Sequence, residues 1–183
     1  MKEVTLFADG SCLGNPGHGG WACILRYGRH ERILRGVALR TTNNRMELEA
    51  AINGLLVLAE RCTVTVITDS KYLERGMTVY LVRWQSRGWR NSRGEAIANR
   101  DLWERLASVA GRHKTTWRWV RGHGSDPDQN RCDVLAKESA KTVNDGRCNR
   151  GAGGLTPYPY ICGRESPRSI STLKPVCAPS FSL

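Results

Sequence analysis

The order of its periodic segments is the feature that most limits how this 183-residue chain can fold. Residues 4–8, 21–27 and 33–39 read as strands, and the short Gly-rich or charged breaks between them suit hairpins. A helical pattern over residues 44–61 then precedes a β-branched run at residues 63–68. A strand that follows a helix suggests a crossover connection. The first third of the chain therefore predicts an antiparallel meander followed by a crossover.

The second part of the pattern alternates helices and strands. A helix fits residues 71–87, with Ser70 or Asp69 as its cap, and a loop rich in Gly and Asn follows. A second helix fits residues 101–111 and a strand fits residues 115–120. Pro127 suits the first position of a final helix. The predicted order is three strands, helix, strand, helices, strand, helix.

The last 39 residues differ in composition from the rest. They contain five Gly, five Pro and five Ser, with little periodicity, so we expect a disordered tail without a packed core. The predicted division is a folded domain over residues 1–143 and a tail over residues 144–183. The chain carries a formal net charge of +11, and about +8 of it belongs to the domain. A polyanionic partner is a reasonable expectation for such a charge.

Several classes of protein are disfavoured by composition. There is no run of about 18 apolar residues and no signal-peptide pattern at the N-terminus, so we expect a cytoplasmic protein without a membrane span. The seven cysteines are odd in number and form no C-x-x-C pair. A zinc ribbon or a disulfide framework is therefore not expected, and free thiols in a reducing compartment are.

Four acids stand at the ends of, or inside, four of the predicted elements: Asp9, Glu47, Asp69 and Asp133. Taken singly, each has an ordinary explanation, since Asp9 before Gly10 suits a turn and Asp69 suits a helix N-cap. Asp133 lies at the edge of an apolar helix face, where a surface position is equally acceptable. Taken together, four acids on four elements could converge on one metal site.

Glu47 is the most informative of these acids. On a helical wheel it aligns with the apolar stripe of Ala51, Gly54 and Leu58. A carboxylate on a packing face needs a partner or a metal. Gly54 adds to this interpretation, because glycine inside a helix is unfavourable and often marks close approach of another segment.

Five motifs together resemble the bacterial type I ribonuclease H enzymes. They are ADGSCLGNPG (residues 8–17), TTNNRMELEAA (41–51), TDSKY (68–72), WVRGHGS (119–125) and NRCDVLA (130–136). They follow the family order and spacing across residues 3–142. The resemblance implies a ribonuclease H-like α/β fold, with a mixed five-stranded sheet flanked by helices. It also implies a monomeric endonuclease that hydrolyses the RNA strand of RNA/DNA hybrids and leaves 3′-hydroxyl and 5′-phosphate ends.

The same resemblance assigns the catalytic and metal-binding residues. Asp9, Glu47, Asp69 and Asp133 match the four carboxylates that hold two Mg²⁺ ions, and Mn²⁺ accepts similar oxygen ligands. Clustered acids repel one another when no cation is present, which raises some of their pKa values. His123 matches a histidine on a mobile loop that assists proton transfer or product release. Without the motif it would be an ordinary surface histidine.

Substrate contacts are assigned in three groups. Cys12, Asn15, Asn43 and Asn44 match positions beside the RNA strand, although the two neighbouring asparagines could also cap a helix. Arg40, Thr42 and Asn99 match a pocket for a phosphate of the DNA strand. The stretch from Lys71 to Arg100 is basic and resembles a protrusion that grips the DNA strand. Its assigned contacts are Lys71, Trp84, Arg87 and Trp89, and the alternative for Trp84 is a place in the core.

Two departures from the family pattern affect substrate binding. Gln85 and Ser86 follow Trp84 where a Lys pair is usual, so we expect hybrid binding either to be weaker or to rely on Arg87 and Arg90. Lys71 stands where a Gln is usual, which leaves the sequence preference around the cut open. Two rival functions remain at this point: a resolvase or integrase on the same fold, and a hybrid-binding module without activity.

Overall fold

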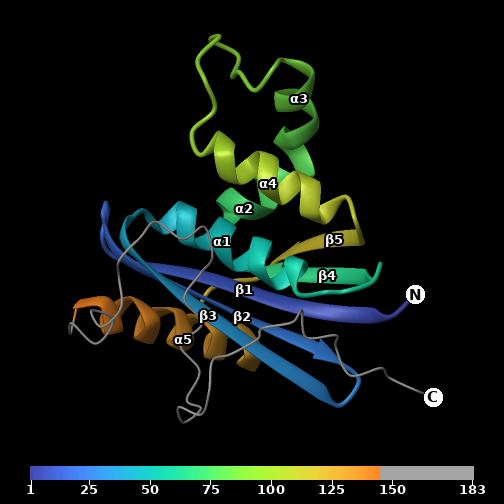
Figure 1. The fold of residues 1–183 in the computed structure, drawn as a ribbon, viewed down its shortest axis with the longest axis vertical. Coiled ribbons are helices and arrows are strands. Elements are labelled where there is room, and N and C mark those ends of the chain that lie inside the picture. The colour runs from blue at the N-terminus through green and yellow to red at the C-terminus, as the bar shows by residue number, and fades with distance from the viewer. Residues whose placement is uncertain (145–183) are drawn as a thin grey trace, which may run out of the picture.

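One mixed five-stranded sheet forms the centre of the computed structural model, which describes residues 1–144 (Figure 1). The strand order is β3-β2-β1-β4-β5. The first three strands form the predicted antiparallel meander, and the crossover strand pairs in parallel with β1 on one side and β5 on the other. The strands are β1 (Glu3–Gly14), β2 (Gly17–Tyr27), β3 (His30–Thr41), β4 (Thr63–Thr68) and β5 (Lys114–Trp119).

The first strand is longer than its apolar pattern predicted. It continues past Ala8 to Gly14, because β2 remains paired with it as far as Gly14 opposite Gly17. Asp9 is therefore a strand residue opposite Ala22, and the turn interpretation of Asp9 is wrong. Pairing with a partner strand outweighs the local turn preference of an Asp-Gly pair.

Helices cover both faces of the sheet (Figure 1). Helix α1 (Asn43–Leu56) packs on one face, where Leu6 and Leu48 lie in the larger core cluster. Helix α5 (Pro127–Asn144) packs on the other, where Phe7 and Cys132 belong to a second cluster. Successive residues of β1 thus point to opposite faces, as strand geometry requires.

Helix α1 is shorter than the predicted 44–61. It ends at Leu56 because the chain must turn back to begin β4 beside the start of β1. Thr63 N donates to the Lys2 carbonyl, and Lys114 N donates to the Cys62 carbonyl. Residues 57–61 make this return.

The predicted helix over residues 71–87 is one helical run with a wider turn in its middle. It consists of α2 (Lys71–Arg75), the π-helix η1 (Gly76–Tyr80) and α3 (Leu81–Ser86). Gly76 lies against the Trp103 ring of α4 (Arg100–Ala110), where a Cβ would have no room. The π-turn and this contact bring Trp84 onto Trp103, with ring centroids 5.2 Å apart.

Residues 81–99, here called the arm, comprise α3 and the loop before α4, and they project away from the sheet (Figure 1).

Cys12, Cys23, Cys62 and Cys132 are free thiols. No helix within the described part of the chain is long and apolar enough to cross a membrane. The predicted disordered tail beyond Asn144, with its three cysteines, lies outside the described residues.

Candidate active site

Asp9 occupies the middle of the central strand and is only 3% exposed. Its Oδ1 accepts a hydrogen bond of 2.7 Å from the Gly10 backbone N–H. A side chain at Gly10 would collide with the backbone of Met46 and Glu47. Glycine here therefore allows the first turn of α1 to rest directly on β1, and this contact brings Glu47 to Asp9.

Glu47 and Asp69 reach Asp9 from two other elements. Glu47 is 5% exposed on the packing face of α1, as its helical-wheel position predicted. Asp69 follows β4, which runs parallel to β1 with Ile67 opposite Phe7. Asp69 therefore lies at the same level of the sheet as Asp9. One carboxylate oxygen from each of the three acids lies within 4.8 Å of the others.

The electrostatics of this cluster are those of acids that lack a counterion. Burial, followed by the charges of Asp69 and Asp133, raises the pKa of Asp9 to about 8. Burial and the Asp9 charge raise the pKa of Glu47 well above its ordinary value. The pKa of Asp69 is raised as well, chiefly by burial. The cluster therefore favours the binding of protons or of a cation.

Two buried oxygens in the cluster have no hydrogen-bond partner: Asp9 Oδ2 and Glu47 Oε2. Buried polar atoms nearly always have a hydrogen-bond partner, so these two unpaired oxygens are available to bind a ligand. Carboxylate oxygens are the donors that Mg²⁺ and similar hard cations prefer. The residues present therefore fit a divalent metal.

Asp133 lies beside the three-acid cluster and is not part of it. Helix α5 approaches β2 closely because Gly20 has no side chain to collide with the Ala140 backbone. The Asp133 side chain is 20% exposed, and its Oδ2 lies 2.7 Å from Lys137 Nζ. Its charge still contributes to the raised pKa of Asp9 and of Asp69. The structure thus brings the fourth acid near the others, already paired with a lysine.

His123 stands on the loop between β5 and α5. Its backbone has a positive φ of 52°, and its side chain is 77% exposed. Its Nδ1 lies 3.9 Å from Asp133 Oδ2. Gly122, just before it, lies against the Asp69 carboxylate, where a Cβ would meet Oδ2 at 2.5 Å. The loop therefore crosses the acids closely and presents His123 at the open side of the site.

Two residues that support Asp69 were not singled out from the sequence. Gln129 is 2% exposed and donates from Nε2 to Asp69 Oδ1 at 3.4 Å, while its Oε1 has no partner. Trp119 donates from Nε1 to the Asp69 backbone carbonyl at 2.8 Å. A signal for Gln129 was available, because it lies one helical turn before Asp133 on the packed side of α5. Nothing local distinguishes Trp119.

The residues predicted beside the RNA strand gather at the rim of the site. Asn15 Oδ1 accepts from the Asn43 backbone N–H at 3.3 Å, and Asn43 Nδ2 donates to Glu47 Oε1 at 3.3 Å. Cys12 Sγ donates to the Thr41 carbonyl. The helix cap is Thr42, so neither Asn43 nor the exposed Asn44 has that role.

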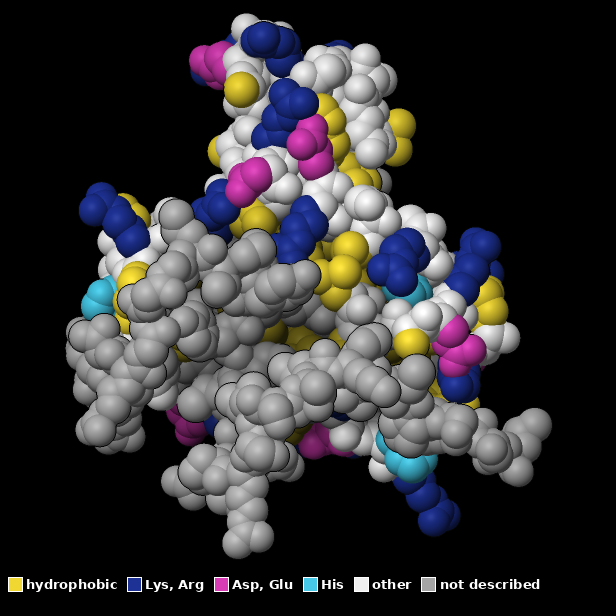
Figure 2. All heavy atoms as spheres, in the orientation of Figure 1, with side chains coloured by type: hydrophobic (Ala, Val, Ile, Leu, Met, Phe, Trp, Pro, Cys, Tyr) yellow, Lys and Arg dark blue, Asp and Glu magenta, His cyan; other side chains and the backbone are white. Residues whose placement is uncertain are grey.

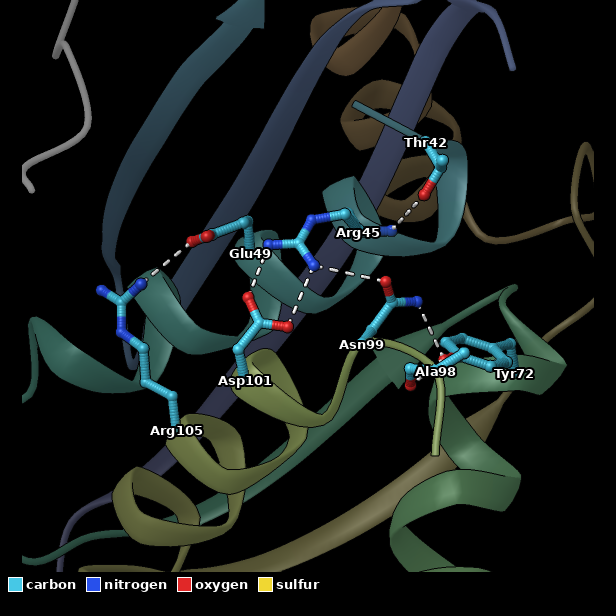
Figure 3. A network of polar contacts seen from close by, with 8 residues as sticks. All are labelled: Thr42, Arg45, Glu49, Tyr72, Ala98, Asn99, Asp101 and Arg105. Carbon is cyan, nitrogen blue, oxygen red and sulfur yellow. Dashed lines mark hydrogen bonds and ion pairs between the residues drawn. The ribbon is translucent and has the colours of Figure 1, made fainter. Parts of the chain in front are cut away.

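Of the three residues predicted to bind a DNA-strand phosphate, two are connected through a shared partner and the third is not. Thr42 and Asn99 both contact Arg45, through its backbone and its guanidinium respectively (Figure 3). Arg40 is exposed at the end of β3, and no ion pair within residues 1–144 involves it.

The arm carries four exposed arginines, and the dark blue of basic side chains marks them at the top of Figure 2. They are Arg83, Arg87, Arg90 and Arg93. Arg83, Arg87 and Arg90 line a cleft of about 390 Å³ together with Tyr80 and Trp84, whose rings are stacked. Trp84 and Trp89 are half-buried against the core, so the core alternative for Trp84 is partly correct. Near the acids, Lys71 Nζ lies 4.9 Å from the Trp119 ring centroid.

Known proteins match both the sequence and the fold. The family model described as RNase H matches residues 1–141. Ribonuclease H of Xanthomonas oryzae pv. oryzae is 49% identical over 147 residues, which cover 80% of this chain and 98% of that protein. Ribonuclease HI of Xylella fastidiosa is 50% identical over 140 residues, covering 76% and 93%.

Solved structures agree. A crystal structure of a type 1 RNase H with the type 2 active-site motif aligns with a TM-score of 0.71 and 33% identity, covering 78% of this chain and 74% of that one. RNase H1 of the halophilic archaeon Halobacterium salinarum aligns with a TM-score of 0.56 and 21% identity, covering 76% and 98%. At that identity the second match reports a shared fold alone.

Proposed function

This chain belongs to the ribonuclease H family and acts as a nuclease on RNA/DNA hybrids, and we propose that it hydrolyses the RNA strand with two Mg²⁺ ions. The expected products end in a 3′-hydroxyl and a 5′-phosphate. The observation that carries the proposal is the group of two buried acids and one half-buried acid with oxygens within 4.8 Å of one another. Such a group is costly to bury unless a cation occupies it.

The four acids hold the metals in this proposal. Asp9, Glu47 and Asp69 supply the converging oxygens, and one buried oxygen of Asp9 and one of Glu47 have no protein partner. Asp133 adds a fourth carboxylate once it leaves Lys137. When bound, divalent cations supply activation of the attacking water and stabilisation of the leaving oxygen. Mn²⁺ takes similar ligands and is the alternative metal.

Protein groups position the acids and handle the proton. Gln129 and Trp119 hold Asp69 by its side chain and its carbonyl, so its second carboxylate oxygen stays available. His123 accepts or donates a proton at its imidazole on the open side of the site, where its exposure lets it meet substrate or product. Gly122 and Gly124 flank His123 in the sequence, and their backbone freedom lets the loop move with the histidine.

The hybrid lies across the acids and the arm in this proposal. Small polar groups at the rim read the 2′-hydroxyls of the RNA strand across its shallow minor groove. These groups are Cys12, Asn15, Asn43 and Asn44. Arg40, Thr42 and Asn99 take a phosphate of the DNA strand, while Lys71, Trp84, Arg87 and Trp89 contact the strands further along. The exposed cations of the arm support this path. We propose that the enzyme acts as a monomer, which sedimentation with and without hybrid tests.

The experiment is cleavage of one labelled oligonucleotide, presented as hybrid, duplex RNA, duplex DNA or single-stranded RNA, with Mg²⁺ or EDTA. Metal-dependent cutting of the hybrid alone, abolished by Asp9→Asn, is the expected result. Glu138→Gln is the matched control, because this acid is exposed on α5 and pairs with Arg35 away from the cluster. Binding without cutting would favour the inactive module, and cutting of duplex DNA would favour a resolvase or integrase.

A further inference from the structure

The Arg45 guanidinium joins the start of α1 to the start of α4 (Figure 3). Its two terminal nitrogens donate to the two oxygens of Asp101, at 3.0 Å from Nη1 and 2.6 Å from Nη2. Nη1 also donates to Asn99 Oδ1 at 3.3 Å. A forked pair of this kind fixes orientation as well as distance. Arg45 therefore fastens the beginning of α4 to the beginning of α1.

The same residue is bonded to Thr42. The Arg45 backbone N–H donates to Thr42 Oγ1 at 3.4 Å, which is the N-cap bond of α1. One residue thus contacts both Thr42 and Asn99, which lie 57 positions apart in the sequence. These are two of the three residues proposed to take a phosphate of the DNA strand.

Asn99 is held in an orientation that its own helix does not explain. It occupies the N-cap position of α4 with a left-handed backbone, φ 58° and ψ 31°, and its side chain makes no capping bond. Its Oδ1 faces Arg45, and its Nδ2 donates to Tyr72 Oη at 3.1 Å. Trp103 Nε1 donates to the same hydroxyl at 3.0 Å. These partners fix the amide with its oxygen toward Arg45 and its nitrogen toward Tyr72. One Nδ2 proton is left for a ligand.

Arg45 also affects the charge near Asn99, through its pairing with Asp101. The hydrogen bond and charge of Arg45 lower the pKa of Asp101, so this carboxylate stays ionised. Its side chain is 62% exposed and only two residues from Asn99. An unpaired carboxylate there would repel a phosphate, whereas the forked pair neutralises it.

We propose that Arg45 is a positioning residue for the DNA-strand phosphate. It orients the Asn99 amide, ties it to Thr42 and cancels the charge of Asp101. This inference rests on the proposed function, because it assumes that Thr42 and Asn99 bind that phosphate. It assigns no part in the chemical step to Arg45.

The test compares Arg45→Met with Arg105→Met in the full chain. Arg105 is the matched control, because it also links α4 to α1, through Glu49 at 3.4 Å, but lies away from Thr42 and Asn99 (Figure 3). Loss of charge-assisted positioning in Arg45→Met should raise KM for the hybrid about 5- to 20-fold and leave kcat within about twofold. Arg105→Met should keep the wild-type KM. Arg45→Lys, which keeps the charge and loses the fork, should raise KM similarly and serves if the Met variant does not fold.

Two further measurements separate positioning from general loss of structure or direct contact. A hybrid with one methylphosphonate, moved along the DNA strand, should weaken wild-type binding at one position and have little effect there on Arg45→Met. Arg45→Met and Asn99→Ala should not be additive in KM, because the first acts through the second.

Wild-type cleavage of the unmodified hybrid tests the proposed function separately. Where that cleavage is present, three results would each overturn the inference alone: an unchanged KM in both Arg45 variants, equal sensitivity of wild type and variant at every methylphosphonate, or additive effects with Asn99→Ala.

Discussion

Lys137 Nζ lies 2.7 Å from Asp133 Oδ2, one helical turn along α5, so the fourth acid of the site is paired with a cation of its own helix. Asp9, Glu47 and Asp69 have no such pair among the ion pairs of residues 1–144. The site is thus divided into three acids ready for a cation and one that must first be released.

Lys137→Met should therefore strengthen metal binding. Removing the ammonium frees Asp133 and leaves the site more negative, so the weaker metal-binding step should tighten about 3- to 10-fold. Calorimetric titration of the full chain with Mn²⁺ measures this without substrate. Lys141→Met, one turn further along α5, is the control. Equal affinities in both variants would mean that Lys137 does not compete with the metal.

Stability without metal should depend on pH through Asp9. Its pKa is raised from 3.8 to about 8 in the folded protein, so between these values the folded state holds a proton that the unfolded state has lost. Stability in EDTA should therefore fall as pH rises through this window, by at most about 1.4 kcal/mol per pH unit for one group, and level off above it.

The measurement is urea unfolding of wild type and Asp9→Asn at several pH values in EDTA. The variant should be the more stable at pH 8 and should lose most of that advantage near pH 4, because the neutral amide does not titrate. Mg²⁺ should restore wild-type stability at the higher pH by binding the folded state. An identical pH dependence of the two chains would contradict the raised pKa of Asp9.

His123→Ala should slow turnover without affecting folding. The side chain is 77% exposed, so the unfolding midpoint should stay near that of wild type. Because His123 assists proton transfer or product release, its loss should lower kcat about 10- to 100-fold. Single-turnover cleavage separates the two roles, because only proton transfer slows it. Wild-type rates in both assays would remove His123 from the mechanism.

Lys71→Gln should weaken hybrid binding in a salt-dependent way. The ammonium lies on the Trp119 ring, 4.9 Å from its centroid, and Trp119 is bonded to the Asp69 carbonyl. If Lys71 contacts one phosphate, the slope of log affinity against log salt should fall by about 0.7 to 0.9. Lys114→Gln, at the other end of β5, should leave the slope unchanged. A slope unchanged in Lys71→Gln would exclude the phosphate contact.

A chain that ends at Asn144 should fold and cleave the hybrid. The family match ends at residue 141 and α5 ends at Asn144, so every acid of the site lies within this part. The measurement is circular dichroism followed by hybrid cleavage at matched concentration. A folded but inactive truncation would show that residues 145–183 take part in the reaction.

Local sequence patterns predicted most of the helices and strands and singled out the four acids. The period-2 pattern, the Ser70 cap and the Pro127 start placed the helices and strands, and the apolar stripe of α1 marked Glu47 as buried. These features depend on near neighbours, whose spacing decides which side chains share a face. The motifs then identified the family through their order.

Contacts between segments that are distant in the sequence became evident in the fold alone. Asp9 is a strand residue because β2 pairs with it, and the π-turn at Gly76 follows from Trp103. The Arg45–Asn99 contact joins residues 54 positions apart, and the Gln129–Asp69 contact joins residues 60 apart. Local periodicity carries no information on such pairs, because they depend on sheet order and helix placement. The pairing of Asp133 with Lys137 is local in sequence, but only the fold places it beside the other three acids.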